Sequence, residues 1–128
     1  MTTIHALIID DNASNLEVLA GLLELQGISY TAVKDPTKIS ATLSSLPKVD
    51  LVLCDLEMPR MDGYELLKIL RKQFGSAVPI IACTVHLREI NATRDLGFDG
   101  FIGKPLDAEK FPDQITRILG GLPVWEMP

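Results

Sequence analysis

The chain has 128 residues, of which 47% are hydrophobic and 23% charged, and its formal net charge is −5. This length suits one domain with one core, and the apolar content excludes a disordered chain. The acidic balance argues against direct binding to nucleic acid, which needs clustered Lys and Arg. No apolar stretch approaches the ~20 residues of a membrane span, and the N-terminus lacks the basic region of a signal peptide. We therefore expect a cytoplasmic protein.

Short apolar runs alternate along the chain with longer segments of helical periodicity. The expected strands are 4–9, 28–33, 50–54, 79–83 and 100–103, and the expected helices are 14–26, 36–45, 63–73, 88–96 and 107–119. The first, third and fourth strands are almost continuously apolar, which is typical of strands buried on both faces of a parallel sheet. Five such units predict a doubly wound α/β domain with right-handed crossovers.

Polar residues that can carry chemistry stand where the expected strands end. Asp10 and Asp11 follow the first strand, and Asp55 follows the third. Thr84 follows the fourth strand, and Lys104 follows the fifth. Sheets of this class bind ligands outside the carboxyl ends of their strands, so we expect these five side chains to converge on one edge of the sheet.

Three neighbouring carboxylates predict a site for a hard cation. Two carboxylates ~4 Å apart repel by roughly 4 kcal/mol at an effective dielectric near 20, and a bound cation removes that cost. Oxygen ligands select Mg²⁺ or Mn²⁺ over zinc. A carboxylate is also a nucleophile toward phosphorus. Lys104 could neutralise one phosphoryl oxygen, and the Thr84 hydroxyl could donate a hydrogen bond to another.

Each of these features also has a plain structural explanation. Residues 11–14, Asp-Asn-Ala-Ser, suit the N-cap of a helix, and Asp62-Gly63 suits a turn. Cys54 and Cys83 lie inside apolar runs and suit small buried hydrophobic residues better than a metal pair. The joint placement of the acids, Thr84 and Lys104 at strand ends favours a functional site.

Residues 4–119 resemble the receiver domain of two-component response regulators. The matching segments are, in order, IIDDN (8–12), DLEMPRMDG (55–63), PIIACT (79–84) and GFDGFIGKP (97–105). DLEMPRMDG is highly specific for this family. The resemblance implies a flavodoxin-like, five-stranded parallel sheet of order 2-1-3-4-5. We expect the receiver domain to occupy residues 1–121 and a short tail, a surface clasp or the start of a linker, to occupy 122–128.

The resemblance also implies a metal site and an acceptor. Asp55 is expected to accept a phosphoryl group from a histidine of a sensor histidine kinase or a histidine phosphotransfer protein. Mg²⁺, or Mn²⁺ in its place, is expected to bind Asp11 and Asp55 directly, Asp10 through a water, and Glu57 through its backbone carbonyl.

A switch is implied as well. Thr84 and Lys104 are expected to contact the phosphoryl group, Phe101 falls at the rotating aromatic position of the family, and the Lys104–Pro105 bond is expected to be cis. Phosphorylation adds about −1.5 to −2 charge at the sheet edge. The surface from the fourth helix through the fifth strand to the fifth helix is expected to report this change to a downstream protein.

Three details depart from the common pattern of the family. Val85 stands where the family often has a small alanine, and Glu57 and His86 occupy rim positions. We expect Glu57, Val85 and His86 to set the lifetime of the phosphorylated state. The stretch between Thr84 and Lys104 is also slightly short for the family, which leaves the start and length of the fourth helix open.

The leading interpretation is a stand-alone phosphorelay receiver, a phosphoacceptor and not an enzyme. Its alternative is the receiver part of a longer hybrid kinase or transcription regulator, although the N-terminal Met argues against an internal fragment. A metal-dependent phosphatase of the haloacid-dehalogenase type would place its nucleophile on the first strand with a second Asp two residues later, whereas position 57 is Glu. A flavin binder would need a phosphate-binding loop where Asp10-Asp11 stands. The sequence leaves the oligomeric state open.

Overall fold

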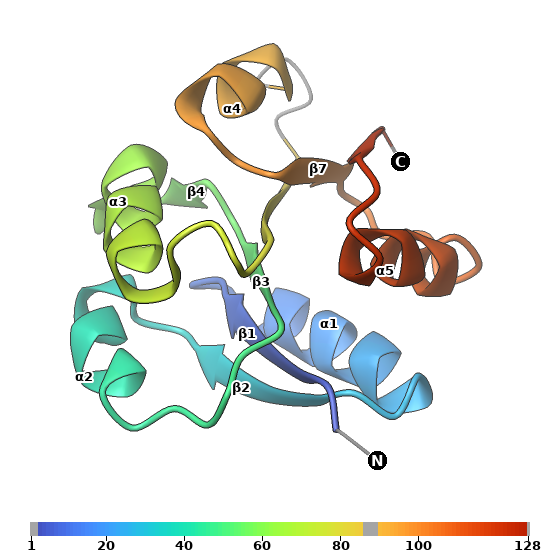
Figure 1. Cartoon of the computed structure of the whole chain (residues 1–128), viewed down its shortest axis with the longest axis horizontal. Helices are drawn as coiled ribbons and strands as arrows, with labels where there is room; N and C mark the ends of the chain where they lie inside the picture. The colour runs from blue at the N-terminus through green and yellow to red at the C-terminus, as the bar shows by residue number, and fades with distance from the viewer. Residues whose placement is uncertain (1–2, 86–89, 128) are drawn as a thin grey trace.

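The structure is a computed structural model that describes residues 3–85 and 90–127 (Figure 1). Its strands are β1 (His5–Ile9), β2 (Ser29–Val33), β3 (Leu51–Cys54), β4 (Glu57–Met58), β5 (Met61–Asp62), β6 (Ile80–Thr84), β7 (Gly100–Gly103) and β8 (Val124–Glu126). Its helices are α1 (Ala13–Leu25), the 3-10 turn η1 (Pro36–Lys38), α2 (Ile39–Leu43), α3 (Gly63–Phe74), α4 (Ile90–Leu96) and α5 (Phe111–Leu119).

The main sheet has six parallel strands in the order β2-β1-β3-β6-β7-β8. The predicted α/β class and the order of the first five strands are confirmed, but the prediction of only five strands is wrong. The sixth strand comes from the tail, where residues 124–126 lie beside β7. Three residues are too few for a periodicity signal, which is why the sequence did not reveal this strand.

Helices cover both faces of the sheet (Figure 1): α1 and α5 lie on one face, and α2 and α3 lie on the other. Successive residues of a strand point to opposite faces, so Leu7 and Ile9 pack toward α2 and α3, whereas Ala6 and Ile8 pack toward α1 and α5. All four side chains are fully buried. The continuous apolar run of β1 therefore serves two cores, one on each side of the sheet.

Two expected helices differ from the prediction, and each has a proline in its first turn. The segment 36–45 divides into η1 and α2, and the Asp35 side chain caps η1 by accepting from the Thr37 N–H at 3.0 Å. The last helix starts at Phe111 instead of residue 107, with Pro112 in its first turn. Proline has no N–H to leave unpaired there, so it suits a helix start. Residues 107–110 form a turn closed by the Asp107 carboxylate.

Asn12 and Asp62 are the N-caps of two helices, and only the first of these caps lies in a segment that the sequence predicted to cap a helix. The N-cap of α1 is Asn12, whose side chain accepts from the Asn15 N–H at 3.1 Å. The segment predicted as a turn at Asp62-Gly63 instead joins the short β4–β5 hairpin to α3, because Asp62 ends β5 and caps the helix through the Tyr64 N–H at 2.7 Å.

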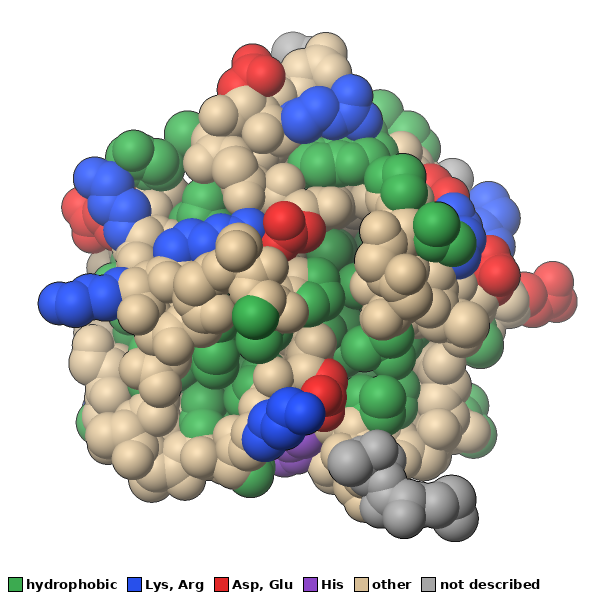
Figure 2. All heavy atoms as spheres, viewed as in Figure 1, with side chains coloured by type: hydrophobic (Ala, Val, Ile, Leu, Met, Phe, Trp, Pro, Cys, Tyr) green, Lys and Arg blue, Asp and Glu red, His purple; other side chains and the backbone are tan. Residues whose placement is uncertain are grey.

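Within residues 3–85 and 90–127, none of the helices combines the length and apolar character needed to cross a membrane. On the face shown in Figure 2, the Lys and Arg side chains of these residues lie apart from one another, with acidic and apolar side chains between them.

Candidate functional site

Carboxylates that follow two neighbouring strands meet at the carboxyl edge of the sheet. Asp10 directly follows β1 and Asp55 directly follows β3, and the residues before them, Ile9 and Cys54, are register partners. Asp11 adds a third carboxylate, and one oxygen from each of the three lies within 4.8 Å of the others. Asp10 and Asp55 are buried and Asp11 is half-buried, so the cluster is accessible from the Asp11 side.

Main-chain hydrogen bonds hold two of these carboxylates in place. Oδ1 of Asp10 accepts from the Asn12 N–H at 2.9 Å. Oδ1 of Asp55 accepts from the Glu57 N–H at 3.1 Å, and the Asp55 N–H donates to the Ile9 carbonyl at 2.9 Å. In each residue the second oxygen, Oδ2, is left to face the centre of the site.

Lys104 provides the positive charge of the site. Its Nζ lies 2.6 Å from Oδ2 of Asp10 and 3.7 Å from Oδ2 of Asp55, and its side chain is only 9% exposed. The Lys104 N–H donates to the Thr84 carbonyl at 2.9 Å, which ties the end of β7 to the end of β6. The Lys104–Pro105 peptide bond is cis. The sequence indicated Lys104 as a site residue. Only the distances in the structure show that Asp10 is its nearest partner among the described acids.

The charge and donor set of the site fit a hard divalent cation. Three carboxylates and one ammonium leave a formal charge of −2. Burial raises the pKa of Asp55 above its ordinary value, and the neighbouring Asp10 raises it further, while the Glu57 N–H and Lys104 oppose this shift. The ionised Asp55 is therefore costly without a cation, and a cation bound to these oxygens would lower that cost.

The two expected switch residues lie close to this edge. Thr84 ends β6 and is fully buried. Phe101 lies on β7, between its register partners Ala82 on β6 and Trp125 on β8. It is already fully buried, in the core on the α3 side.

The expected rim residues are only partly described. Glu57 is exposed, and Val85 is 60% exposed at the mouth of the site. His86 lies outside the described residues. Their effect on the lifetime of a phosphorylated state stays a prediction.

The cysteines take no part in the site. Cys54 and Cys83 are free thiols buried in the two different cores, one on each side of the sheet. Burial raises the pKa of Cys83 to about 12 and that of Cys54 above its ordinary value as well. Both thiols are therefore protonated, as expected of small buried hydrophobic residues.

The family model of the response regulator receiver domain matches residues 6–116. The chain belongs to this family. This chain is thus a receiver domain, a module of phosphorelay signalling.

Individual relatives agree with this assignment. The rice (Oryza sativa subsp. japonica) protein "Two-component response regulator ORR5" is 28% identical, over 90% of this chain and 88% of its own length. The rice "Probable histidine kinase 4" is 30% identical over 91% of this chain. The crystal structure of the receiver domain of a histidine kinase from Syntrophus aciditrophicus has a TM-score of 0.77 and 30% identity, covering 93% of this chain and 92% of that one.

The receiver spans only a small part of several relatives. The match covers 14% of the rice kinase and 10% of the yeast "Osmosensing histidine protein kinase SLN1". Receivers of this family thus occur both in proteins of similar length and inside long kinases.

Proposed function

We propose that Asp55 accepts a phosphoryl group from a phosphohistidine of a sensor histidine kinase or a histidine phosphotransfer protein. The observation that carries this proposal is the position of Asp55 Oδ2, in an acidic cluster and 3.7 Å from Lys104 Nζ. In the transfer, this oxygen forms a bond to phosphorus while the phosphorus–nitrogen bond breaks, and the imidazole leaves with the electron pair. Transfer of radiolabel from a phosphorylated histidine protein to this chain, and its loss in Asp55→Asn, tests the proposal.

We propose Mg²⁺ as the cofactor, with Mn²⁺ as a substitute. Asp11 and Asp55 would hold it directly, Asp10 through a water, and Glu57 through its carbonyl oxygen. Bound Mg²⁺ neutralises charge on a transferring phosphoryl group. Support comes from the all-oxygen cluster and its formal charge of −2.

Lys104 and Thr84 then stabilise the product. The Lys104 ammonium lies 2.6 Å from Asp10 and 3.7 Å from Asp55, and a phosphoryl group on Asp55 adds further negative charge beside it. The Thr84 hydroxyl can donate to another phosphoryl oxygen. Charge-assisted hydrogen bonds of this kind are about twice as strong as neutral ones, so both residues favour the phosphorylated state.

Millimolar Mg²⁺ is expected to stabilise the protein against urea, by about 2.7 kcal/mol at a concentration one hundred times the Kd. Asp11→Asn should lose most of this gain because it removes a direct ligand. Asp95→Asn is the matched control, since Asp95 lies exposed on α4. Equal Mg²⁺ responses of the two variants in urea titrations would contradict the assignment of Asp11.

This chain has a surface hollow, close to the proposed acceptor, that suits the binding of the donor protein. A hollow next to Lys104 and Pro105 is lined by Val18, Val85 and Leu106. Val18 is 55% exposed although it is apolar. We propose that an apolar helix face of the donor packs here, which would bring its phosphohistidine to Asp55.

Val85→Ala is expected to shorten the lifetime of phosphorylated Asp55 by roughly 2- to 10-fold, because a smaller side chain at the mouth of the site opens a path for water. The rate of phosphate loss after removal of the donor measures this. Val18→Ala is the control, because it trims the same hollow from the α1 side. An unchanged lifetime in Val85→Ala and in Glu57→Ala would remove these residues from the mechanism.

The setting of the domain has two candidates. The rice regulator, matched over 88% of its length, is an example of a free-standing receiver, and the rice histidine kinase, matched over 14% of its length, is an example of a receiver within a longer kinase. The cytoplasmic location and the absence of nucleic-acid binding stay predictions in both settings.

A further inference from the structure

The tail of the chain crosses the edge of the sheet that the sequence assigned to signal output. β8 pairs with β7 in the register Gly100–Val124, Phe101–Trp125 and Ile102–Glu126. Val124 is buried in the core on the α5 side. Trp125 packs against the other core, and the Arg94 guanidinium of α4 lies 4.5 Å from its ring centre. β8 thus lies beside β7 at the edge of the sheet and contacts α4 through one of its faces and the α5 side through the other.

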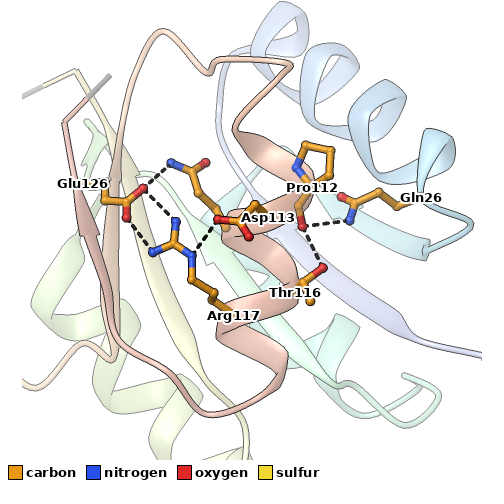
Figure 3. A network of polar contacts seen from close by, with 7 residues as sticks. Gln26, Pro112, Asp113, Thr116, Arg117 and Glu126 are labelled. Carbon is orange, nitrogen blue, oxygen red and sulfur yellow. Dashed lines mark hydrogen bonds and ion pairs between the residues drawn. The ribbon is translucent and has the colours of Figure 1, made fainter.

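Glu126 is the polar anchor of this strand (Figure 3). Arg117 donates to both of its carboxylate oxygens, at 2.7 and 3.1 Å, and the Gln114 amide donates to one of them at 3.0 Å. Arg117 is itself held by Asp113 at 2.9 Å. Two basic side chains therefore flank the edge of β7, Arg94 of α4 on one side and Arg117 of α5 on the other.

The β7 edge is shaped for the close approach of a strand. A Cβ atom at Gly100 would lie 2.7 Å from the Val124 carbonyl oxygen and 2.8 Å from Cδ1 of Ile81 on β6. The Ile81 side chain can turn away, whereas the Val124 backbone cannot move away without leaving β7. The absence of a side chain at Gly100 is thus required for β8 to pair here. An uncovered strand edge of this kind readily binds an extended peptide.

β8 is a short strand at the edge of the sheet, and its polar anchor is partly exposed. The strand has three residues, its ion pair with Arg117 is partly exposed to water, and α5 leads to it through Gly120 and Gly121. Gly121 has φ +81°, a conformation that glycine adopts without strain. Short terminal elements with exposed anchors open at a lower free energy than a sheet interior.

We propose that the edge of β7 is a strand-binding site which β8 occupies within the same chain, and that it takes a partner protein's extended segment when β8 detaches. The partner segment carries an apolar, an aromatic and an acidic residue in succession, as Val124, Trp125 and Glu126 do. The apolar residue fills the α5-side core, the aromatic ring lies against Arg94, and the carboxylate pairs with Arg117. This site does not depend on the phosphoacceptor function, and its tests need no phosphorylation.

Native-state hydrogen exchange on the full chain tests whether β8 detaches. The amides of residues 124–126 are expected to exchange at least about 100-fold faster than those of β1 and β3, without global unfolding. Equal protection of β8 and β3 would overturn the proposal.

Binding of a fluorescent peptide tests the site itself. The probe is the hexapeptide of residues 122–127, Leu-Pro-Val-Trp-Glu-Met, added to full-length variants. Glu126→Lys breaks the pair with Arg117 and frees the site, so the peptide should bind at least about tenfold tighter than to the wild type, because apparent affinity scales with the fraction of free sites. Glu17→Lys makes the same charge change on the exposed face of α1 and should leave binding unchanged.

Two further experiments test whether the peptide binds specifically at the edge of β7. Adding Gly100→Ala to Glu126→Lys should abolish peptide binding, because the new Cβ meets the incoming strand, and a probe with Lys in place of Glu should not bind. Circular dichroism and urea unfolding check that each variant is folded. Peptide binding no tighter to Glu126→Lys than to the wild type, or a Glu126→Lys variant that dimerises instead of binding the probe, would overturn the proposal.

Discussion

Asp55→Asn is expected to abolish phosphoryl incorporation from acetyl phosphate while the fold is kept. An amide nitrogen does not attack phosphorus, yet Asn has nearly the shape of Asp and its Oδ1 can still accept from the Glu57 N–H, now at 3.1 Å. Incubation with Mg²⁺ and acetyl phosphate, followed by intact-protein mass spectrometry, measures the incorporation. The wild type should gain one labile phosphoryl group and the variant none.

Asp50→Asn is the matched control for this experiment. Asp50 stands at the other end of β3, where its Oδ2 accepts from the His5 N–H at 2.9 Å. It is thus a carboxylate on the same strand but remote from the cluster, and its variant should incorporate phosphate like the wild type. Incorporation in Asp55→Asn at the wild-type level would place the acceptor elsewhere.

The stability of Asp55→Asn provides a second, independent test of the environment of the Asp55 carboxylate. Burial and the neighbouring Asp10 raise the pKa of Asp55, so the ionised carboxylate costs free energy in the folded protein. This cost is present above the folded-state pKa of Asp55 and disappears as the pH falls below its unfolded-state value, where both states are protonated. In chelator at neutral pH, the variant should therefore unfold at the same urea concentration as the wild type or a higher one.

Lys104→Met is expected to destabilise the protein by about 3–5 kcal/mol in chelator, which is typical of removing one partner of a buried ion pair. Asp10 is 1% exposed and pairs with Lys104 at 2.6 Å. Met keeps the length of the side chain but removes the ammonium that lies 2.6 Å from Asp10 and 3.7 Å from Asp55. Urea unfolding with chelator gives the loss.

Mg²⁺ should restore part of the stability of Lys104→Met, because a cation bound by the three carboxylates replaces the positive charge that the Lys104 ammonium supplied. The gain from Mg²⁺ is therefore expected to be larger in this variant than in the wild type. Lys72→Met, on the exposed face of α3, is the control and should change stability by no more than about 0.5 kcal/mol. A Lys104→Met variant as stable as the wild type in chelator would show that the ion pair with Asp10 contributes little to the free energy of unfolding.

β8 lies on the face that was predicted to be the output surface. The sequence predicted that α4, β7 and α5 report phosphorylation to a downstream protein. In the structure, Trp125 and Glu126 stand on that face and are bound to Arg94 of α4 and Arg117 of α5. A partner that binds there meets β8 together with the two helices.

Local sequence patterns were sufficient for the predictions that depend on neighbours in the chain. The apolar runs of β1, β3 and β6 predicted buried parallel strands, because a strand covered on both faces needs apolar residues at nearly every position. The acids and Lys104 at strand ends predicted one site, because parallel strands bring their carboxyl ends to the same edge. The chemistry of the residues left the role of each one open, and the expected roles came from the resemblance to receivers.

By itself, then, the sequence determined the α/β class and the membership of the acidic site, since these follow from periodicity and from the direction of the strands. The order of the first five strands came from the resemblance to receivers. Only the tertiary structure decided that Lys104 pairs with Asp10, that Phe101 is buried beside Trp125, and that the tail adds a sixth strand. These contacts join residues far apart in the chain. Val124–Glu126 becomes a strand only because Gly100, Arg94 and Arg117 are gathered at the edge of β7, and no pattern within three residues can encode that.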